Sequence, residues 1–316
     1  MFKGLLLRAL SHFRHKPQAD AASRYRDQWQ IERNGLKERQ KWVDWGDHPT
    51  VLALLQEELF GNPNIDLFSF LRSAHPDFSS MHALSLCCGS AEFEDQLLSH
   101  GVFRNITGLE LAPQRIEAAL HTSSAQQGRL RMVQQDVNLG QFGEGLYDVV
   151  FAKAALHHIE NLEAAFAGIR RSLKPGGRLV AIDFFGPSRF QWTDKQLSLV
   201  NRFLETEIPL ELRLMENDQP YRAERPTIAQ MLEMDPSEAA RSDELMNFIG
   251  AHFRQVQVFQ VGGTLLNLIF PGTIINRFDE NNIEHTDIIR RAYSYEKASL
   301  RAGEVASDFL FVVATL

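Results

Sequence analysis

The sequence contains little cysteine, and this excludes one class of protein. Only two of its 316 residues are cysteines, Cys87 and Cys88, and they are adjacent. Neighbouring cysteines rarely satisfy the geometry of a disulfide, so the chain does not resemble a small secreted scaffold held by disulfides. We therefore predict a protein of a reducing compartment and place it in the cytoplasm.

Long apolar runs and an excess of positive charge are also missing. No run approaches the roughly 20 apolar residues that a membrane-spanning helix needs, so we expect no integral membrane segment. Asp and Glu outnumber Lys and Arg by 40 to 33, which gives a net charge of −7. Because nucleic-acid binders gain affinity by neutralising phosphates with basic side chains, we predict no nucleic-acid partner.

One segment is basic. Residues 1–16 carry two lysines and two arginines and no acidic residue. Three interpretations are open: a plain N-terminal helix, an amphipathic helix on a membrane surface, and an organellar presequence. We favour the plain helix and keep a weak peripheral membrane contact through residues 1–16 as an alternative.

Hydrophobic patterning divides the chain into four parts. Residues 1–80 are predicted to form a helical N-terminal extension, and residues 81–186 a core of alternating strands and helices. Residues 187–250 are predicted to form a helical substrate-facing lid, and residues 251–316 to return to the core with a helical insertion. Within the extension, apolar residues at helical spacing predict a helix over Val51–Phe60, capped within the four residues before it.

Seven short apolar segments are predicted to be strands. Helical stretches separate the first five, which indicates βαβ units and a parallel sheet. The segments are Ala83–Cys87, Asn105–Leu111, Leu130–Val133, Tyr147–Ala152, Arg178–Phe184, Val256–Phe259 and Phe309–Ala314. Lys174–Gly177 is predicted to be a turn, and Asp235–Glu238 the capped start of a helix, with Asp235 as the N-cap.

Three successive strands end in residues suited to binding a nucleoside. The first runs into a tight turn at Gly89, where backbone N–H groups can approach a ligand. Glu110 lies about twenty residues further on, where an acid can accept hydrogen bonds from ribose hydroxyls. Asp136 ends the third strand, where it can accept from an adenine amino group, and Val137 adds an apolar face. Carboxyl ends of adjacent parallel strands meet at one crevice, so these residues are expected to lie together.

At these residues the sequence resembles the class I S-adenosylmethionine-dependent methyltransferases. LSLCCGSA (84–91) stands where the family has a pattern such as LDLGCGTG, and TGLELAP and QQDVN match the ends of its second and third strands. YDVV followed by LHH (156–158) and the LKPGG turn (173–177) match later motifs. The resemblance implies an α/β fold with a Rossmann-like, seven-stranded, mostly parallel sheet, helices on both faces and helical lid insertions. It also implies S-adenosylmethionine as co-substrate. We predict no metal, because the sequence offers no further ligands at fixed spacing to join the adjacent histidines.

The resemblance transfers the cofactor site residue by residue. The implied cofactor-binding residues are Leu86, Cys87, Cys88, Gly89, Ser90, Glu110, Leu111, Asp136, Val137 and Lys153. Three positions depart from the family. Ser85 replaces an acid that often organises the methionine ammonium, and Cys87 and Ala91 replace glycines, so that backbone approach is hindered but not blocked.

The acceptor is predicted to be a small molecule or a sugar-type compound, with O-methylation slightly favoured. Residues 151–155 lack the Asp/Asn-Pro-Pro-aromatic motif of nucleic-acid amino methyltransferases. His157, His158 and Tyr221 are the candidates for a general base, and a structural role for the two histidines stays open. Two alternatives remain: a non-catalytic Rossmann-like binding module and an NAD-dependent oxidoreductase, which the missing glycines disfavour. The sequence does not indicate an oligomeric state.

Overall fold

The computed structural model describes residues 41–215 and 217–316. The chain divides into two compact units. Among the described residues, the sheet unit comprises 65–188, 239–260 and 309–316, and the helical unit comprises 41–64, 189–215, 217–238 and 261–308. The basic segment 1–16, with its three interpretations, lies outside the described residues, and the fourfold division of the chain stays a prediction.

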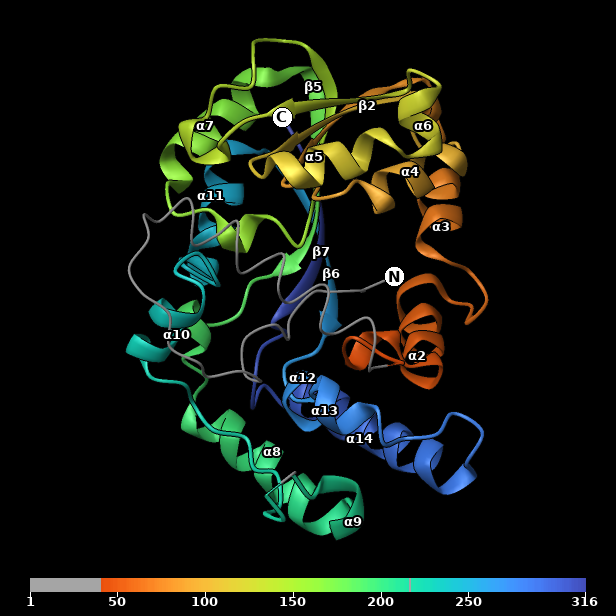
Figure 1. Cartoon of the computed structure of the whole chain (residues 1–316), viewed down its shortest axis with the longest axis vertical. Coiled ribbons are helices and arrows are strands. Elements are labelled where there is room, and N and C mark those ends of the chain that lie inside the picture. The colour runs from red at the N-terminus through yellow and green to blue at the C-terminus, as the bar shows by residue number, and fades with distance from the viewer. Residues whose placement is uncertain (1–40, 216) are drawn as a thin grey trace. The chain divides into compact units, whose positions relative to one another are not determined.

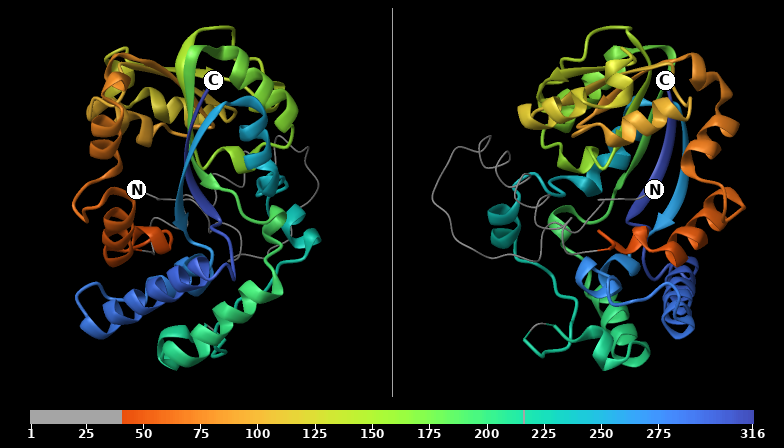
Figure 2. Two further views of the ribbon diagram at one scale, coloured as in Figure 1. Left: turned by 180° about the vertical axis from the view of Figure 1, so that it is seen from behind. Right: turned by 45° about the vertical axis from the view of Figure 1, so that its right-hand side comes forward.

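The sheet unit is organised around a seven-stranded sheet in the order β3-β2-β1-β4-β5-β7-β6. The strands are β1 (His82–Leu86), β2 (Asn105–Glu110), β3 (Leu130–Gln134), β4 (Tyr147–Lys153), β5 (Leu173–Phe184), β6 (Gln255–Gly262) and β7 (Phe309–Thr315). The first five pair in parallel, and β7 pairs antiparallel to β5. Strands β6 and β7 run side by side (Figure 2). The predicted seven-stranded, mostly parallel sheet is therefore confirmed.

Helices cover both faces of this sheet, as predicted. On one side, α4 and α5 contact β2, and on the other α7 packs against β5 and α11 (Figure 1). The helices of the sheet unit are α3 (Leu67–Ala74), α4 (Glu92–Ser99), α5 (Pro113–Leu120), α6 (Ser123–Gln126), α7 (Leu162–Ser172) and α11 (Leu245–His252). Because both faces are covered, strands such as β1 and β4 are apolar and buried along most of their length.

Two local predictions were wrong. The predicted turn Lys174–Gly177 lies inside β5, where the pairing with β4 shifts register and Gly176 adopts a φ of 73°. The segment is thus an irregularity in a strand, of the kind that bends a strand without ending it. Asp235 does not start a helix, because it follows the last residue of α10 (Ile228–Met234) and its carboxylate accepts from the Ser237 N–H at 2.8 Å.

The helical unit contains the remaining helices. They are α2 (Pro49–Phe60), α8 (Asp194–Glu207), α9 (Leu210–Arg213), α10 (Ile228–Met234), α12 (Leu266–Ile269), α13 (Gly272–Ile275) and α14 (Ile283–Arg301). The predicted helix Val51–Phe60 is confirmed as α2, which begins two residues earlier after the N-cap residue His48. Among the described residues, no helix combines the length and the apolar character that crossing a bilayer requires.

Candidate active site

The turn after β1 is the centre of the candidate site. It is held by two backbone hydrogen bonds, from the Cys88 N–H to Leu109 O (3.0 Å) and from the Ala91 N–H to Cys88 O (2.9 Å). Gly89 has a φ of 60°, and Cys87 and Ala91 have φ values of 49° and 54°. The two positions where the sequence departs from glycine are therefore left-handed, a conformation that costs a residue with a side chain about 1–2 kcal/mol.

Glu110 lies against this turn. Its Oε2 accepts the Gly89 N–H at 2.9 Å, and its Oε1 accepts the N–H groups of Leu111 (2.8 Å) and Ala112 (2.9 Å). Glu110 is only 8% exposed. The structure thus brings together the two residues that the sequence assigned to one ligand, the glycine turn and the acid at the end of β2.

Asp136 and Val137 follow the next strand in the sheet. Strand β3 pairs in parallel with β2, and Glu110 is in register with Gln134. Asp136 Oδ1 accepts the Asn138 N–H at 2.9 Å and begins a short 3-10 helix, Val137–Leu139, in which Val137 is buried. The ends of β1, β2 and β3 therefore adjoin at one edge, as open parallel sheets require for a ligand site.

The end of β4 carries a tightly organised turn that includes the histidine pair. Asp183, on β5, accepts the N–H groups of Ala155 and Leu156 with Oδ2, both at 2.8 Å. Its Oδ1 forms a short hydrogen bond with His157 Nδ1. His157 is 2% exposed, and its ring contacts that of the half-buried His158, with centroids 4.1 Å apart and planes tilted by 40°. The contact between Nδ1 and this carboxylate fixes the orientation of the His157 ring.

Two acids near the candidate site, Asp183 and Glu94, were not predicted from the sequence. Glu94 lies in the first turn of α4, and its Oε1 accepts a hydrogen bond from the Ser85 hydroxyl at 2.7 Å. Asp183 had a weak signal, as an acid at the end of an apolar strand. Glu94 had none, because nothing in the sequence shows that its side chain turns inward.

Lys153 ends β4, and its Nζ lies 4.9 Å from the centre of the Phe93 ring. This contact is a cation–π interaction. It places the positive charge beside the first turn of α4, near the candidate cofactor site.

The two cysteines of the turn are free thiols. Burial raises the pKa of both, and the negative charge of Glu110 raises it further. They are protonated near neutral pH, so neither is suited to act as a nucleophile.

Tyr221 belongs to the helical unit. Its hydroxyl donates to Leu268 O at 2.9 Å, and burial raises its pKa. A phenol with a structural partner and a raised pKa is a poor proton acceptor near neutral pH, so Tyr221 is poorly suited to be the general base.

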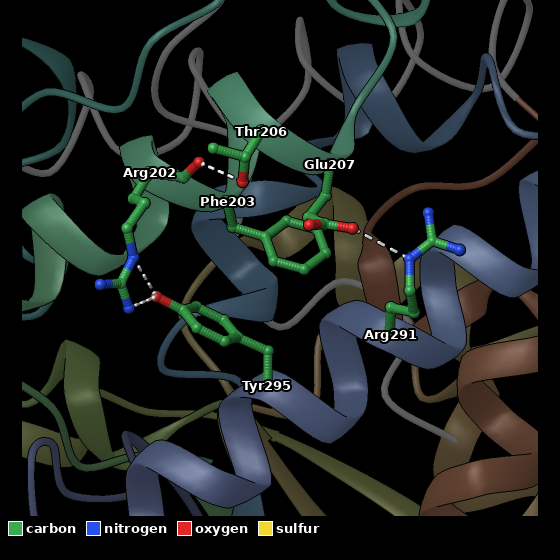
Figure 3. A pocket seen from close by; sticks show the side chains of 6 residues that line it. All are labelled: Arg202, Phe203, Thr206, Glu207, Arg291 and Tyr295. Carbon is green, nitrogen blue, oxygen red and sulfur yellow. Dashed lines mark hydrogen bonds and ion pairs between the residues drawn. The ribbon is translucent and has the colours of Figure 1, made fainter.

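The helical unit also contains a hollow of about 430 Å³ between α8 and α14, shown in Figure 3. Arg202 donates to the Tyr295 hydroxyl at 2.7 Å, and Arg291 pairs with Glu207 at 3.0 Å. Both cations are used in holding the two helices together. The hollow carries none of the residues that the sequence assigned to the cofactor.

Comparison with known proteins agrees with this geometry. Residues 84–181 match the family model described as "Methyltransferase domain". With the strand order and the residues at the ends of β1, β2 and β3, this match identifies the domain as a class I S-adenosylmethionine-dependent methyltransferase domain. For residues 84–181 the match agrees with the family that the sequence resembles, and that family implies S-adenosylmethionine as the co-substrate.

The particular relatives differ in the acceptors for which they are named. The chain is 31% identical to demethylmenaquinone methyltransferase of Leptospira interrogans over 117 residues, which is 36% of this chain and 47% of that protein. It is 25% identical to a sterol 4-C-methyltransferase of Caenorhabditis elegans over 216 residues, 60% of this chain and 61% of that protein. The chain spans about half the length of the first relative.

A solved S-adenosylmethionine-dependent methyltransferase from Mesorhizobium loti is also similar. It is 17% identical, covers 78% of this chain and 96% of its own, and superposes with a TM-score of 0.44.

Proposed function

We propose that this protein transfers a methyl group from S-adenosylmethionine to a small organic acceptor with an ionisable hydroxyl group. The observation that carries the proposal is the placement of Glu110 against the Gly89 turn, beside Asp136, at adjoining strand ends. A carboxylate at this position suits two neighbouring ribose hydroxyls, and small residues in the turn permit close approach of the ligand.

The chain's own residues divide the work of binding. Glu110 would hold the ribose, Asp136 the adenine amino group, and Val137 the apolar face of the base. When bound, the cofactor supplies a methyl group on a sulfonium centre, so the protein is left to orient the acceptor and to exclude water.

We assign removal of the acceptor's proton to His157. Asp183 fixes the orientation of the ring through Nδ1 and stabilises the imidazolium once a proton is taken at Nε2. Loss of a proton from a phenol activates both its oxygen and its ring carbons, so this arrangement serves O- and C-methylation alike. The small-molecule or sugar-type acceptor and the preference for O-methylation remain proposals, alongside the quinone-type and sterol acceptors for which relatives are named.

Binding is the first test. Titration calorimetry of the full chain should detect S-adenosylhomocysteine and no binding of NAD. Binding of NAD alone would favour an oxidoreductase, and binding of neither would overturn the proposal. Transfer of tritium from S-[methyl-³H]adenosylmethionine to demethylmenaquinol, a sterol or a hexose then distinguishes the acceptor classes. A protein that binds the cofactor but labels no acceptor in a wider panel would be a binding module.

The base has its own test. With a labelled acceptor in hand, His157→Ala should lower kcat by about 10²–10⁴-fold and abolish the fall of kcat at acidic pH. The affinity for S-adenosylhomocysteine should stay within twofold, and His158→Ala is the matched control. If His157 is only structural, the variant will lose thermal stability while its pH profile keeps the wild-type shape.

A further inference from the structure

Glu94 is a buried acid that has no role in the proposed binding of adenosine or in proton removal from the acceptor. It is 4% exposed, and its Oε1 accepts from the Ser85 hydroxyl at 2.7 Å. Within the part of the chain that the structure describes, its Oε2 is buried without a hydrogen-bond partner. A buried carboxylate oxygen that lacks a partner destabilises the fold, so it is expected to have a use.

The surroundings of Glu94 belong to the candidate cofactor site. Ser85 is on β1, two residues before Cys87, the first cysteine of the turn, and Glu94 is three residues after Ala91. Burial raises the pKa of Glu94, while the hydrogen bond from Ser85 and the charge of Lys153 oppose this rise. The Lys153 ammonium is held over the Phe93 ring of the same helix turn. The Glu94 carboxyl group on α4 and the Lys153 ammonium group on β4 thus lie beside the Gly89 turn.

Ser85 stands where the family resemblance implies an acid for the methionine ammonium. A serine hydroxyl carries no charge, and here it donates a hydrogen bond to Glu94. The carboxyl group that β1 lacks at this position is therefore present on α4, one hydrogen bond away. The arrangement moves the carboxylate from the strand to the helix without removing it from the site.

We propose that Glu94 binds the α-ammonium group of the cofactor's methionine end, and that Ser85 positions it for this role. Lys153 is the matching cation for the α-carboxylate at the same end. This inference rests on the proposed function, because it assumes that S-adenosylmethionine binds at the Gly89 turn. It assigns recognition of the amino-acid end to a residue pair rather than to a single acid on β1.

Two ligands separate this inference from the proposed function. S-adenosylhomocysteine carries the amino-acid end, and 5′-methylthioadenosine keeps the adenosine and thioether but lacks that end. Glu94→Gln retains the size of the side chain and removes the charge. Titration calorimetry should show at least a tenfold loss of affinity for S-adenosylhomocysteine and a change of less than twofold for 5′-methylthioadenosine.

Glu92→Gln is the control, since Glu92 lies in the same turn of α4 but is exposed. It should change neither affinity by more than twofold. Glu94→Asp keeps the carboxyl group but moves it away from the ligand, because the side chain is one methylene shorter. If Glu94→Gln does not fold, Glu94→Asp replaces it in the experiment and should show the same selective loss. Equal losses for both ligands, or none, would overturn the role of Glu94. Failure of the wild-type protein to bind either ligand would instead overturn the proposed function.

Discussion

Glu110 in the sheet unit and Glu296 in the helical unit use their carboxylates in the same way. Glu110 accepts the N–H groups of Gly89, Leu111 and Ala112. Glu296, on α14, accepts those of Gly263 (2.9 Å), Leu265 (2.7 Å) and Leu266 (2.9 Å). Each acid therefore ties a glycine-containing turn to a neighbouring element.

The two sites differ in what surrounds them. Glu296 is fully buried, and the three residues that donate to it are buried as well. A Cβ atom on Gly262 would lie 2.3 Å from Glu296 Oε1, so the turn is filled. Glu110 lies near the surface, since Leu111 beside it is 39% exposed. The same hydrogen-bond pattern is thus a closed structural clamp in one unit and an accessible edge in the other.

The largest expected effect is a difference in the free energy of unfolding between variants of Glu296 and Glu110. Glu296→Ala leaves three buried N–H groups without an acceptor, and we expect it to lower the free energy of unfolding by about 3–5 kcal/mol. Glu110→Ala should cost only about 1–2 kcal/mol, because water reaches part of its site. Urea unfolding measures both.

Ligand binding should rank the same two variants in the opposite order. Glu110→Ala should weaken S-adenosylhomocysteine binding at least tenfold, whereas folded Glu296→Ala should bind it as the wild type does. If Glu110→Ala binds S-adenosylhomocysteine as the wild type does, Glu110 has only a structural role, as Glu296 has, and the two acids do not differ in function.

A second prediction concerns pH and the surroundings of Glu296. Asp308 is buried in the helical unit, where its Oδ2 accepts from Gln196 Nε2 at 2.9 Å. Burial raises the pKa of Asp308 from 3.8 to about 7, and the charge of Glu296 adds to this. Between pH 3.8 and about pH 7, Asp308 is protonated in the folded protein but ionised in the unfolded chain. Its stabilising contribution is therefore complete below pH 4 and is lost as pH rises through 7.

We expect the free energy of unfolding to fall by about 2–3 kcal/mol between pH 5 and pH 7 through Asp308. Asp308→Asn cannot titrate and should flatten this part of the profile. Asp194→Asn, at an exposed site in the same unit, is the control and should leave the slope unchanged. An unchanged slope in Asp308→Asn would mean that this carboxyl group titrates normally.

The strands were predictable because their signal is local. Each is a short apolar segment between turn residues, and burial on both faces makes such segments nearly continuous. The errors occurred where local signals compete. Lys174–Gly177 has the composition of a turn, but β4 pairs with β5 on both sides of it, at Leu173 and again from Arg178 onward.

The capping error has the same origin. Asp235 has a good N-cap side chain and an acid three residues later. Thr227 with Gln230 forms the capping box that the structure uses, and α10 begins there instead. A capping pattern shows that a helix is able to start, and tertiary contacts select which of two candidates does so.

The candidate site was predictable to the extent that it follows strand ends. Glu110, Asp136 and Gly89 were found because parallel strands place their carboxyl ends at one edge. Asp183 and Glu94 were not found, because their roles depend on pairings with residues 26 and nine positions away. Which way a side chain turns from a helix end or a strand end is decided by packing, which the sequence does not display.

The smallest expected effect tests the backbone of the Gly89 turn against the turn clamped by Glu296. The turn clamped by Glu296 has glycines at two left-handed positions, with φ values of 93° and 71° at Gly262 and Gly263. The sheet unit places Ala91 at a φ of 54°. Ala91→Gly removes a buried methyl group but relieves this conformation, so it should be neutral or stabilise the fold by up to about 0.5–1 kcal/mol. Ala119→Gly deletes an equally buried methyl group in α5 and should cost about 1–2 kcal/mol. If chemical denaturation gives equal losses for the two variants, the turn carries no backbone strain, and the departure from glycine at position 91 has no energetic consequence.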